Sequence, residues 1–185
     1  MGRRRTLVVY YSRSGHTRGV ARQVAAALEA DLEEIAEPTG RDGVLGYVRS
    51  ALEAIFGASA EIERPRSDPG DYDLVVVGTP VWYAAVSTPV RTYLWVEREH
   101  LPRIAFFLTH GGMGSERVFA QMAALAGKRQ EAELAIRVRD IEAGAEREAI
   151  AAFARSLSHA SSRPGSGRGG RARPRRAARA HGSGA

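Results

Sequence analysis

Six residues that follow a short apolar segment combine three hydroxyl groups with a flexible glycine: Ser12, Arg13, Ser14, Gly15, His16 and Thr17. The next residues have helical spacing. The N-terminus of a helix has free N–H groups and the positive end of the helix dipole, so it favours an anion. Hydroxyls and backbone N–H groups there can hold a phosphate without a lysine. Serine and threonine are also common helix caps, so phosphate binding and simple capping both stay open for this loop.

The spacing of this loop separates it from two better-known phosphate sites. It contains neither the Gly-Lys-Ser/Thr of a P-loop nor the three glycines of the dinucleotide fingerprint. A nucleoside triphosphate is therefore a disfavoured ligand.

A second segment places two adjacent aromatic rings after an apolar run: Thr79, Pro80, Val81, Trp82, Tyr83 and Ala84. Such rings can stack on a planar ligand or contact its edge. Alternatively, one ring covers the end of the sheet and the other packs on a helix. We expect at least one of the two to be structural.

A third segment is rich in glycine: Thr109, His110, Gly111, Gly112, Met113, Gly114 and Ser115. Glycines allow the backbone to approach a flat ligand closely, and their N–H groups can then bond its carbonyls. A left-handed turn before a helix is the alternative. His110 is a weak candidate for donating a hydrogen bond to a reduced ring or to an acceptor. No residue pattern indicates a metal site.

Five strands and five helices are expected to position these segments. The strands are predicted at residues 6–11, 31–36, 73–77, 104–108 and 131–139, and the helices at 17–30, 44–56, 89–97, 116–126 and 142–157. Alternating strands and helices predict an α/β fold, a three-layer doubly wound five-stranded parallel sheet. Three strands are almost wholly apolar, which indicates burial on both faces. The strands at 31 and 131 are polar or alternating, which suits sheet edges.

This pattern predicts the strand order 2-1-3-4-5. Ligands of such sheets bind outside the carboxyl ends of the strands, where the strand order reverses. With this order, the reversal lies between strands one and three, beside the end of strand four. Residues 12–17, 79–86 and 109–115 are therefore expected to converge there.

Composition divides the 185 residues into a domain at 1–158 and a Ser/Gly/Pro/Arg tail at 159–185, which is expected to be disordered. Ten of the 27 basic residues lie in residues 3–5 and the tail, so the remainder, with 21 acidic residues, carries about −4. A weak contact with nucleic acid would therefore rest on the tail. The absence of cysteine excludes disulfides and cysteine-ligated clusters. No apolar run is long enough to span a membrane, and we expect a cytoplasmic protein.

Four motifs together resemble the flavodoxin family, and more closely the short flavodoxin-like proteins grouped with FMN-dependent NAD(P)H oxidoreductases. They are V-V-Y-Y-S-R-S-G-H-T at 8–17, D-Y-D-L-V-V-V-G-T-P-V-W at 71–82, T-P-V-R-T-Y-L at 88–94 and F-F-L-T-H-G-G at 106–112. The resemblance covers residues 6 to about 157. It implies FMN as cofactor, with its phosphate on Ser12, Ser14, Gly15, His16 and Thr17. It also implies that the isoalloxazine lies between segments 79–84 and 109–114.

The resemblance leaves two redox functions open. In one, the protein is an enzyme that passes electrons from NAD(P)H to a small quinone-like acceptor, often as a homo-oligomer. In the other, it is a one-electron shuttle that docks on a redox partner protein. Tyr83-Ala84-Ala85 stands where many flavodoxins have a glycine. Because alanine resists a positive φ, this departure favours two-electron transfer.

Two more distant functions also stay open. Ser14 beside Gly15, together with His110-Gly111-Gly112, suggests a serine hydrolase, although the Gly-x-Ser-x-Gly elbow is missing. The arginine-rich tail suggests a nucleic-acid-binding module.

Overall fold

The computed structural model describes residues 4–37 and 60–160. Its strands are β1 (Thr6–Tyr10), β2 (Asp31–Glu34), β3 (Leu74–Trp82), β4 (Ala85–Val86), β5 (Arg103–His110) and β6 (Glu133–Arg137). Its helices are α1 (His16–Leu28), the 3-10 turn η1 (Pro69–Asp71), α3 (Thr88–Glu97), α4 (Ser115–Ala126), α5 (Val138–Glu142) and α6 (Arg147–Ala160). The helix predicted at 44–56 and nearly all of the predicted tail lie outside the described residues.

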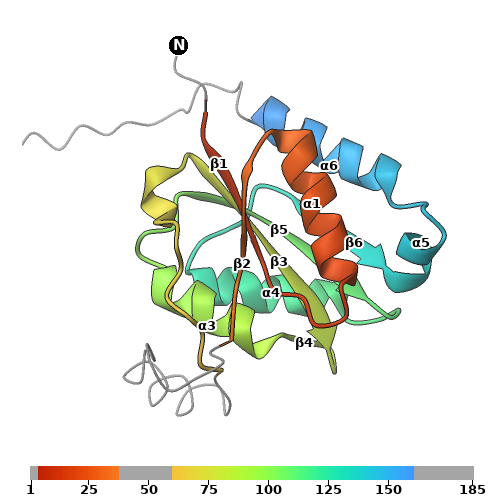
Figure 1. The fold of residues 1–185 in the computed structure, drawn as a ribbon, viewed down its shortest axis with the longest axis horizontal. Helices are drawn as coiled ribbons and strands as arrows, with labels where there is room; N and C mark the ends of the chain where they lie inside the picture. The colour runs from red at the N-terminus through yellow and green to blue at the C-terminus, as the bar shows by residue number, and fades with distance from the viewer. Residues whose placement is uncertain (1–3, 38–59, 161–185) are drawn as a thin grey trace, which may run out of the picture.

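The sheet has the predicted parallel topology. Its five main strands follow the order β2-β1-β3-β5-β6, and the short strand β4 pairs antiparallel with β3. Pairing is parallel throughout the main sheet (Figure 1). The predicted order 2-1-3-4-5 is therefore confirmed, with β5 and β6 as its fourth and fifth members.

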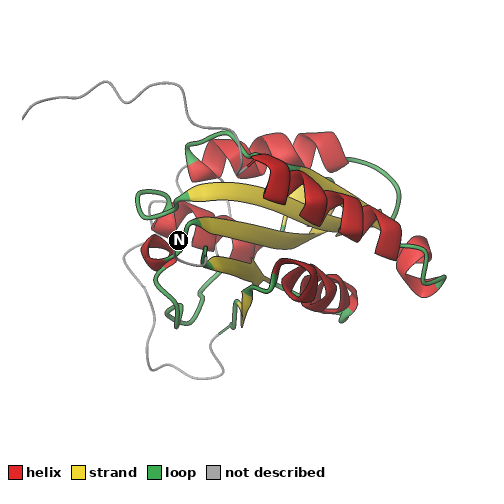
Figure 2. Cartoon of the chain, turned by 90° about the horizontal axis from the view of Figure 1, so that it is seen from above, coloured by secondary structure: helices red, strands yellow, loops and turns green. Residues whose placement is uncertain are grey.

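Helices cover both faces of the sheet (Figure 2). Side chains alternate between the faces of a strand, and β3 shows this clearly. Val75 and Val77 belong to the core under α3 and α4, whereas Val76 packs with residues of α1 and α6. The edge strands also match expectation, because β6 alternates between buried and exposed residues and β2 is largely polar.

β3 is longer than predicted, and residues 79–82 belong to it rather than to a loop. The prediction ended with the apolar run at Val77, and proline, which lacks an N–H, is usually absent from central strands. Pairing of β1 with β3 ends at Gly78, while pairing with β5 continues as far as Pro80. Pro80 therefore sits where β3 no longer pairs with β1. A residue without an N–H is tolerated at this position.

The single helix predicted at 142–157 is wrong at its start. The chain leaves β6 at Arg137, forms the short helix α5, and begins α6 only at Arg147. Gly144 between the two helices has a φ of 67°, a left-handed conformation that glycine adopts readily. The break at Gly144 separates α5 from α6.

One glycine within β3 marks a close contact across the core. A Cβ placed on Gly78 would lie 2.0 Å from Cζ of Phe107, because this ring lies directly over the glycine.

Among the helices of the described ranges, none has the length and apolar character that a membrane span requires.

Candidate functional site at the carboxyl edge of the sheet

The carboxyl ends of β1, β3 and β5 lie side by side at one edge of the sheet (Figure 1). They are neighbouring parallel strands, and Tyr10 of β1 is in register with Gly78, which is in register with Phe107. The segments that follow the three strands are therefore neighbours as well.

Direct contacts join the three segments. The hydroxyl of Thr17, in the first turn of α1, lies 2.8 Å from the hydroxyl of Thr109 at the end of β5. A Cβ on Gly114 would lie 2.9 Å from the Cβ of Ala84, so the third segment packs directly on the second. The structure thus brings the segments together, and their role as ligand contacts stays a prediction.

The first segment forms a turn around the side chain of Ser12. Its Oγ accepts the backbone N–H groups of Gly15, at 3.1 Å, and Arg18, at 3.2 Å. Gly15 is the N-cap of α1 and has a φ of 95°. The helix itself supplies no acceptor for the N–H groups of its first turn, such as those of His16 and Thr17. The loop therefore presents N–H groups and hydroxyls where an anion is favoured.

His16 is held from two sides. The hydroxyl of Ser14 lies 3.0 Å from its Nδ1, and a carboxylate oxygen of Glu142 at the end of α5 lies 3.8 Å from its Nε2. Glu142 belongs to no motif, and only the fold reveals it as a neighbour of this loop. The order serine, histidine, carboxylate is that of a hydrolase triad. However, Glu142 is mostly exposed and beyond hydrogen-bond distance, and this geometry does not favour hydrolysis.

Arg18 does not leave an unpaired charge beside the loop. Its guanidinium binds both carboxylate oxygens of Glu34 on β2, at 2.7 and 3.2 Å. The phenol of Tyr10 donates to the same carboxylate at 3.1 Å. Burial raises the pKa of Tyr10 most, and the negative charge of Glu34 raises it further. This cluster ties the start of α1 to the edge strand.

The second segment is a tight hairpin between β3 and β4. Trp82 is in register with Ala85, so Tyr83 and Ala84 form the two-residue turn. Their φ values are 49° and 57°, as in a type I′ turn, which normally uses asparagine and glycine. The expectation that alanine avoids a positive φ here is therefore wrong. The hairpin geometry and the packing of Gly114 on Ala84 outweigh the local preference.

The two aromatic rings of this segment have different surroundings. Trp82 meets the ring of Tyr11 edge to face, with centroids 5.6 Å apart, and packs against the core. Tyr83 has an exposed fraction of 105%. One ring is therefore structural, as expected, and the other is free.

Burial, with a hydrogen bond donated to Glu37, raises the pKa of Tyr11 to about 12.

Thr79 faces inward rather than toward the strand end. Its side chain is fully buried, and its hydroxyl lies 2.9 Å from that of Ser87 and accepts the N–H of Ser87 at 3.2 Å. The amide oxygen of Gln121 on α4 accepts the N–H of Val86. Sequence reasoning missed Ser87 and Gln121, which hold the returning arm of the hairpin.

In the third segment, Thr109 and His110 belong to β5 rather than to a loop, and residues 111–113 are exposed. His110 is buried, and its Nδ1 has no hydrogen-bond partner among the described residues. Burial lowers the pKa of His110, the charge of Arg137 lowers it further, and Asp140 opposes the shift. These effects favour the neutral form of the imidazole.

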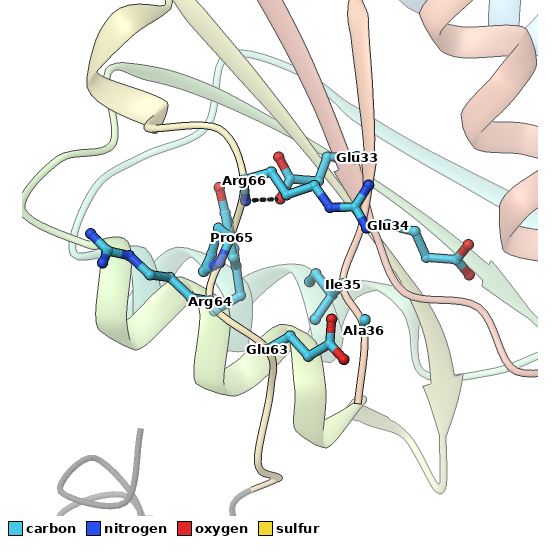
Figure 3. A pocket seen from close by; sticks show the side chains of 9 residues that line it. Glu33, Glu34, Ile35, Ala36, Glu63, Arg64, Pro65 and Arg66 are labelled. Carbon is cyan, nitrogen blue, oxygen red and sulfur yellow. Dashed lines mark hydrogen bonds between the residues drawn. The ribbon is translucent and has the colours of Figure 1, made fainter. Parts of the chain in front are cut away.

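A small cavity that no sequence motif indicated lies between the end of β2, residues 63–66 and Tyr93 of α3 (Figure 3). Its volume is about 30 Å³. The carboxylate of Glu33 beside it accepts the N–H groups of Arg66, at 2.6 Å, and Ser67, at 3.0 Å. An open groove of about 730 Å³ along the same edge reaches Ser12. The groove therefore adjoins the phosphate-loop candidate.

Comparison with known proteins agrees with this arrangement. The sequence model of the family described as Flavodoxin matches residues 5–130. A flavoprotein from Lactobacillus acidophilus NCFM, solved in complex with FMN, is 26% identical, with a TM-score of 0.57 over 77% of this chain and 97% of that one.

Two further structures share the fold at lower identity. A WrbA-like flavodoxin from Agrobacterium tumefaciens is 19% identical, with a TM-score of 0.54 over 86% of this chain and 98% of that one. Oxidised Flavodoxin 2 from Bacillus cereus is 17% identical, with a TM-score of 0.54 over 84% of this chain and 99% of that one.

Proposed function

This chain belongs to the flavodoxin family, and from that premise we propose that it is an FMN-binding redox protein. It passes electrons between NAD(P)H or a reductase and a quinone or protein acceptor. The observation that carries the cofactor assignment is the mutual contact of three segments at the carboxyl edge of the sheet. The FMN complex of the similar Lactobacillus acidophilus flavoprotein supports the same cofactor.

The first segment fits the phosphate of FMN. The first turn of α1 offers N–H groups and the positive end of the helix dipole. The hydroxyls of Ser12 and Ser14 stand at the same turn, and His16 is positioned by Ser14. A phosphate dianion needs several donors and a favourable potential, and this loop provides both without a lysine.

The other two segments fit a flat ring system. Tyr83 can lie against such a ring, because its side chain is exposed and does not pack in the core. The unpartnered Nδ1 of His110 offers one polar contact, and the exposed backbone of residues 111–113 offers more. FMN, when bound, supplies hydride or single-electron transfer, while the protein binds it, orients it and sets its electrostatic surroundings.

A spectrum and a reduction experiment test this proposal. The purified protein, incubated with FMN and passed through gel filtration, is expected to keep the visible absorption of flavin. Under anaerobic conditions, NADPH or NADH is expected to bleach that absorption, and a soluble quinone is expected to restore it. Free FMN at the same concentration is the control.

The outcomes separate the two redox functions. Bleaching by dithionite but by neither nicotinamide contradicts the enzyme and favours the one-electron shuttle. A protein that leaves the column colourless overturns the cofactor assignment itself.

A further inference from the structure

The bond between Thr17 and Thr109 is an enclosed polar contact that joins the first and third segments of the site. The two hydroxyls lie 2.8 Å apart, and the residues are 2% and 3% exposed. A buried hydroxyl without a hydrogen-bond partner is destabilising. Each of these side chains therefore depends on the other for its hydrogen bond.

The two threonines differ in how firmly their backbones are held. Thr109 lies in β5, where it is in register with Pro80 of β3 on one side and with Ile136 of β6 on the other. Thr17 stands in the first turn of α1, next to the loop that the proposed function assigns to the phosphate. The contact therefore runs from a strand paired on both sides to the first turn of a helix.

The direction of the bond follows from the charge of the ligand. An anion at the start of α1 attracts the positive ends of nearby dipoles, so it turns the Thr17 hydroxyl proton toward itself. The Thr17 oxygen then accepts a hydrogen bond, and among the residues that the structure describes its hydroxyl partner is Thr109. Thr109 acts as the donor in this arrangement.

We propose that Thr109 is a positioning residue for the flavin phosphate, acting from the third segment through Thr17. The inference rests on the proposed function. It assigns Thr109 to the phosphate end of the cofactor, although its neighbours His110 and Gly111 belong to the segment assigned to the ring. Its consequence is selectivity, because a flavin without a phosphate gains nothing from this bond.

Binding of two flavins to Thr109→Val tests the proposal. Valine keeps the shape of the side chain and removes only the hydroxyl. The loss of one hydrogen bond predicts that the dissociation constant of FMN rises about fivefold to tenfold, while that of riboflavin changes less than about twofold. Thr109→Ser keeps the hydroxyl and is expected to restore FMN binding. Quenching of flavin fluorescence measures each dissociation constant.

Thr92→Val is the matched control. Thr92 is a buried threonine of α3 whose hydroxyl donates to the carbonyls of Ala60 and Thr88. Its replacement is expected to lower stability to a similar degree without changing FMN affinity. Thr17→Val, alone and combined with Thr109→Val, completes a double-mutant cycle in which the second change adds little to the first. The cycle decides the question even if one variant unfolds more easily.

Three results would overturn the inference. They are unchanged FMN affinity in Thr109→Val, an equal loss of FMN and riboflavin binding, and full additivity in the cycle. A wild-type protein that binds no FMN refutes the proposed function as well, so the two failures are distinguishable.

Discussion

The packing of Gly114 on Ala84 predicts that Gly114→Ala disturbs the hairpin that carries Tyr83. Gly114 has a φ of 88°, and a Cβ there would lie 2.9 Å from the Cβ of Ala84 and 3.2 Å from its Cα. Real Cβ atoms do not approach other carbons so closely. The substitution therefore combines a strained backbone at position 114 with a displaced turn at position 84.

The two costs can be separated. A non-glycine residue in the left-handed region loses about 1–2 kcal/mol, and overpacking costs about 1–3 kcal/mol. Gly114→Ala is therefore expected to lower the free energy of unfolding by about 2–5 kcal/mol. Ala84→Gly is expected to raise it by about 0.5 kcal/mol, because relief of its left-handed conformation is partly offset by the greater entropy of the unfolded chain.

The double variant isolates the steric part. Without the Ala84 methyl group most of the clash disappears and the backbone cost at position 114 remains, so the cycle should give a coupling of about 1–2 kcal/mol. Urea unfolding of the three variants, followed by tryptophan fluorescence, measures it. Effects that add to within about 0.5 kcal/mol would refute the steric contact.

Three further predictions concern stability and cofactor binding. Gly78→Ala places a Cβ inside the Phe107 ring and should cost about 1–3 kcal/mol in urea unfolding, whereas Gly111→Ala, which meets no atom within 4 Å, should cost much less. Glu146 accepts a hydrogen bond from Gln23, which lowers its pKa below the usual 4.5. Its contribution to stability is therefore present above pH 4.5 and lost as the pH falls through the lowered pKa. The stability advantage over Glu146→Gln should shrink in that range, and a gap independent of pH would contradict the assignment. Glu142→Gln should change the FMN dissociation constant less than about threefold, because Glu142 is exposed and 3.8 Å from His16; a tenfold loss in a flavin titration would show that its charge matters.

The strand chemistry allowed most of the fold to be predicted. Apolar runs such as the one at Leu74–Val77 occur where helices cover both faces of a strand, and polar strands such as β2 occur at edges. Together they favour the strand order that the structure shows. The order in turn places residues 12–17, 79–86 and 109–115 at one edge, which no single motif shows.

The remaining features depend on tertiary contacts that leave no local pattern. Pro80 indicates the end of a strand, yet β3 continues through it because the β1 neighbour has already ended. Ala84 indicates a negative φ, yet hairpin pairing and Gly114 hold it at a positive one. Glu142 reaches His16 only because α5 folds back after β6. In each case a long-range contact outweighs the local preference.

Titration of the flavin-free protein with FMN tests the central claim most directly. The account predicts saturable quenching of flavin fluorescence with one FMN per chain. It also predicts that Ser12→Ala, which removes the hydroxyl at the centre of the phosphate loop, weakens FMN binding about tenfold. Ser156→Ala, on α6 away from the loop, should have no effect. Absence of quenching by the wild-type protein, or equal affinity of Ser12→Ala and wild type, would contradict the assignment of this edge to FMN.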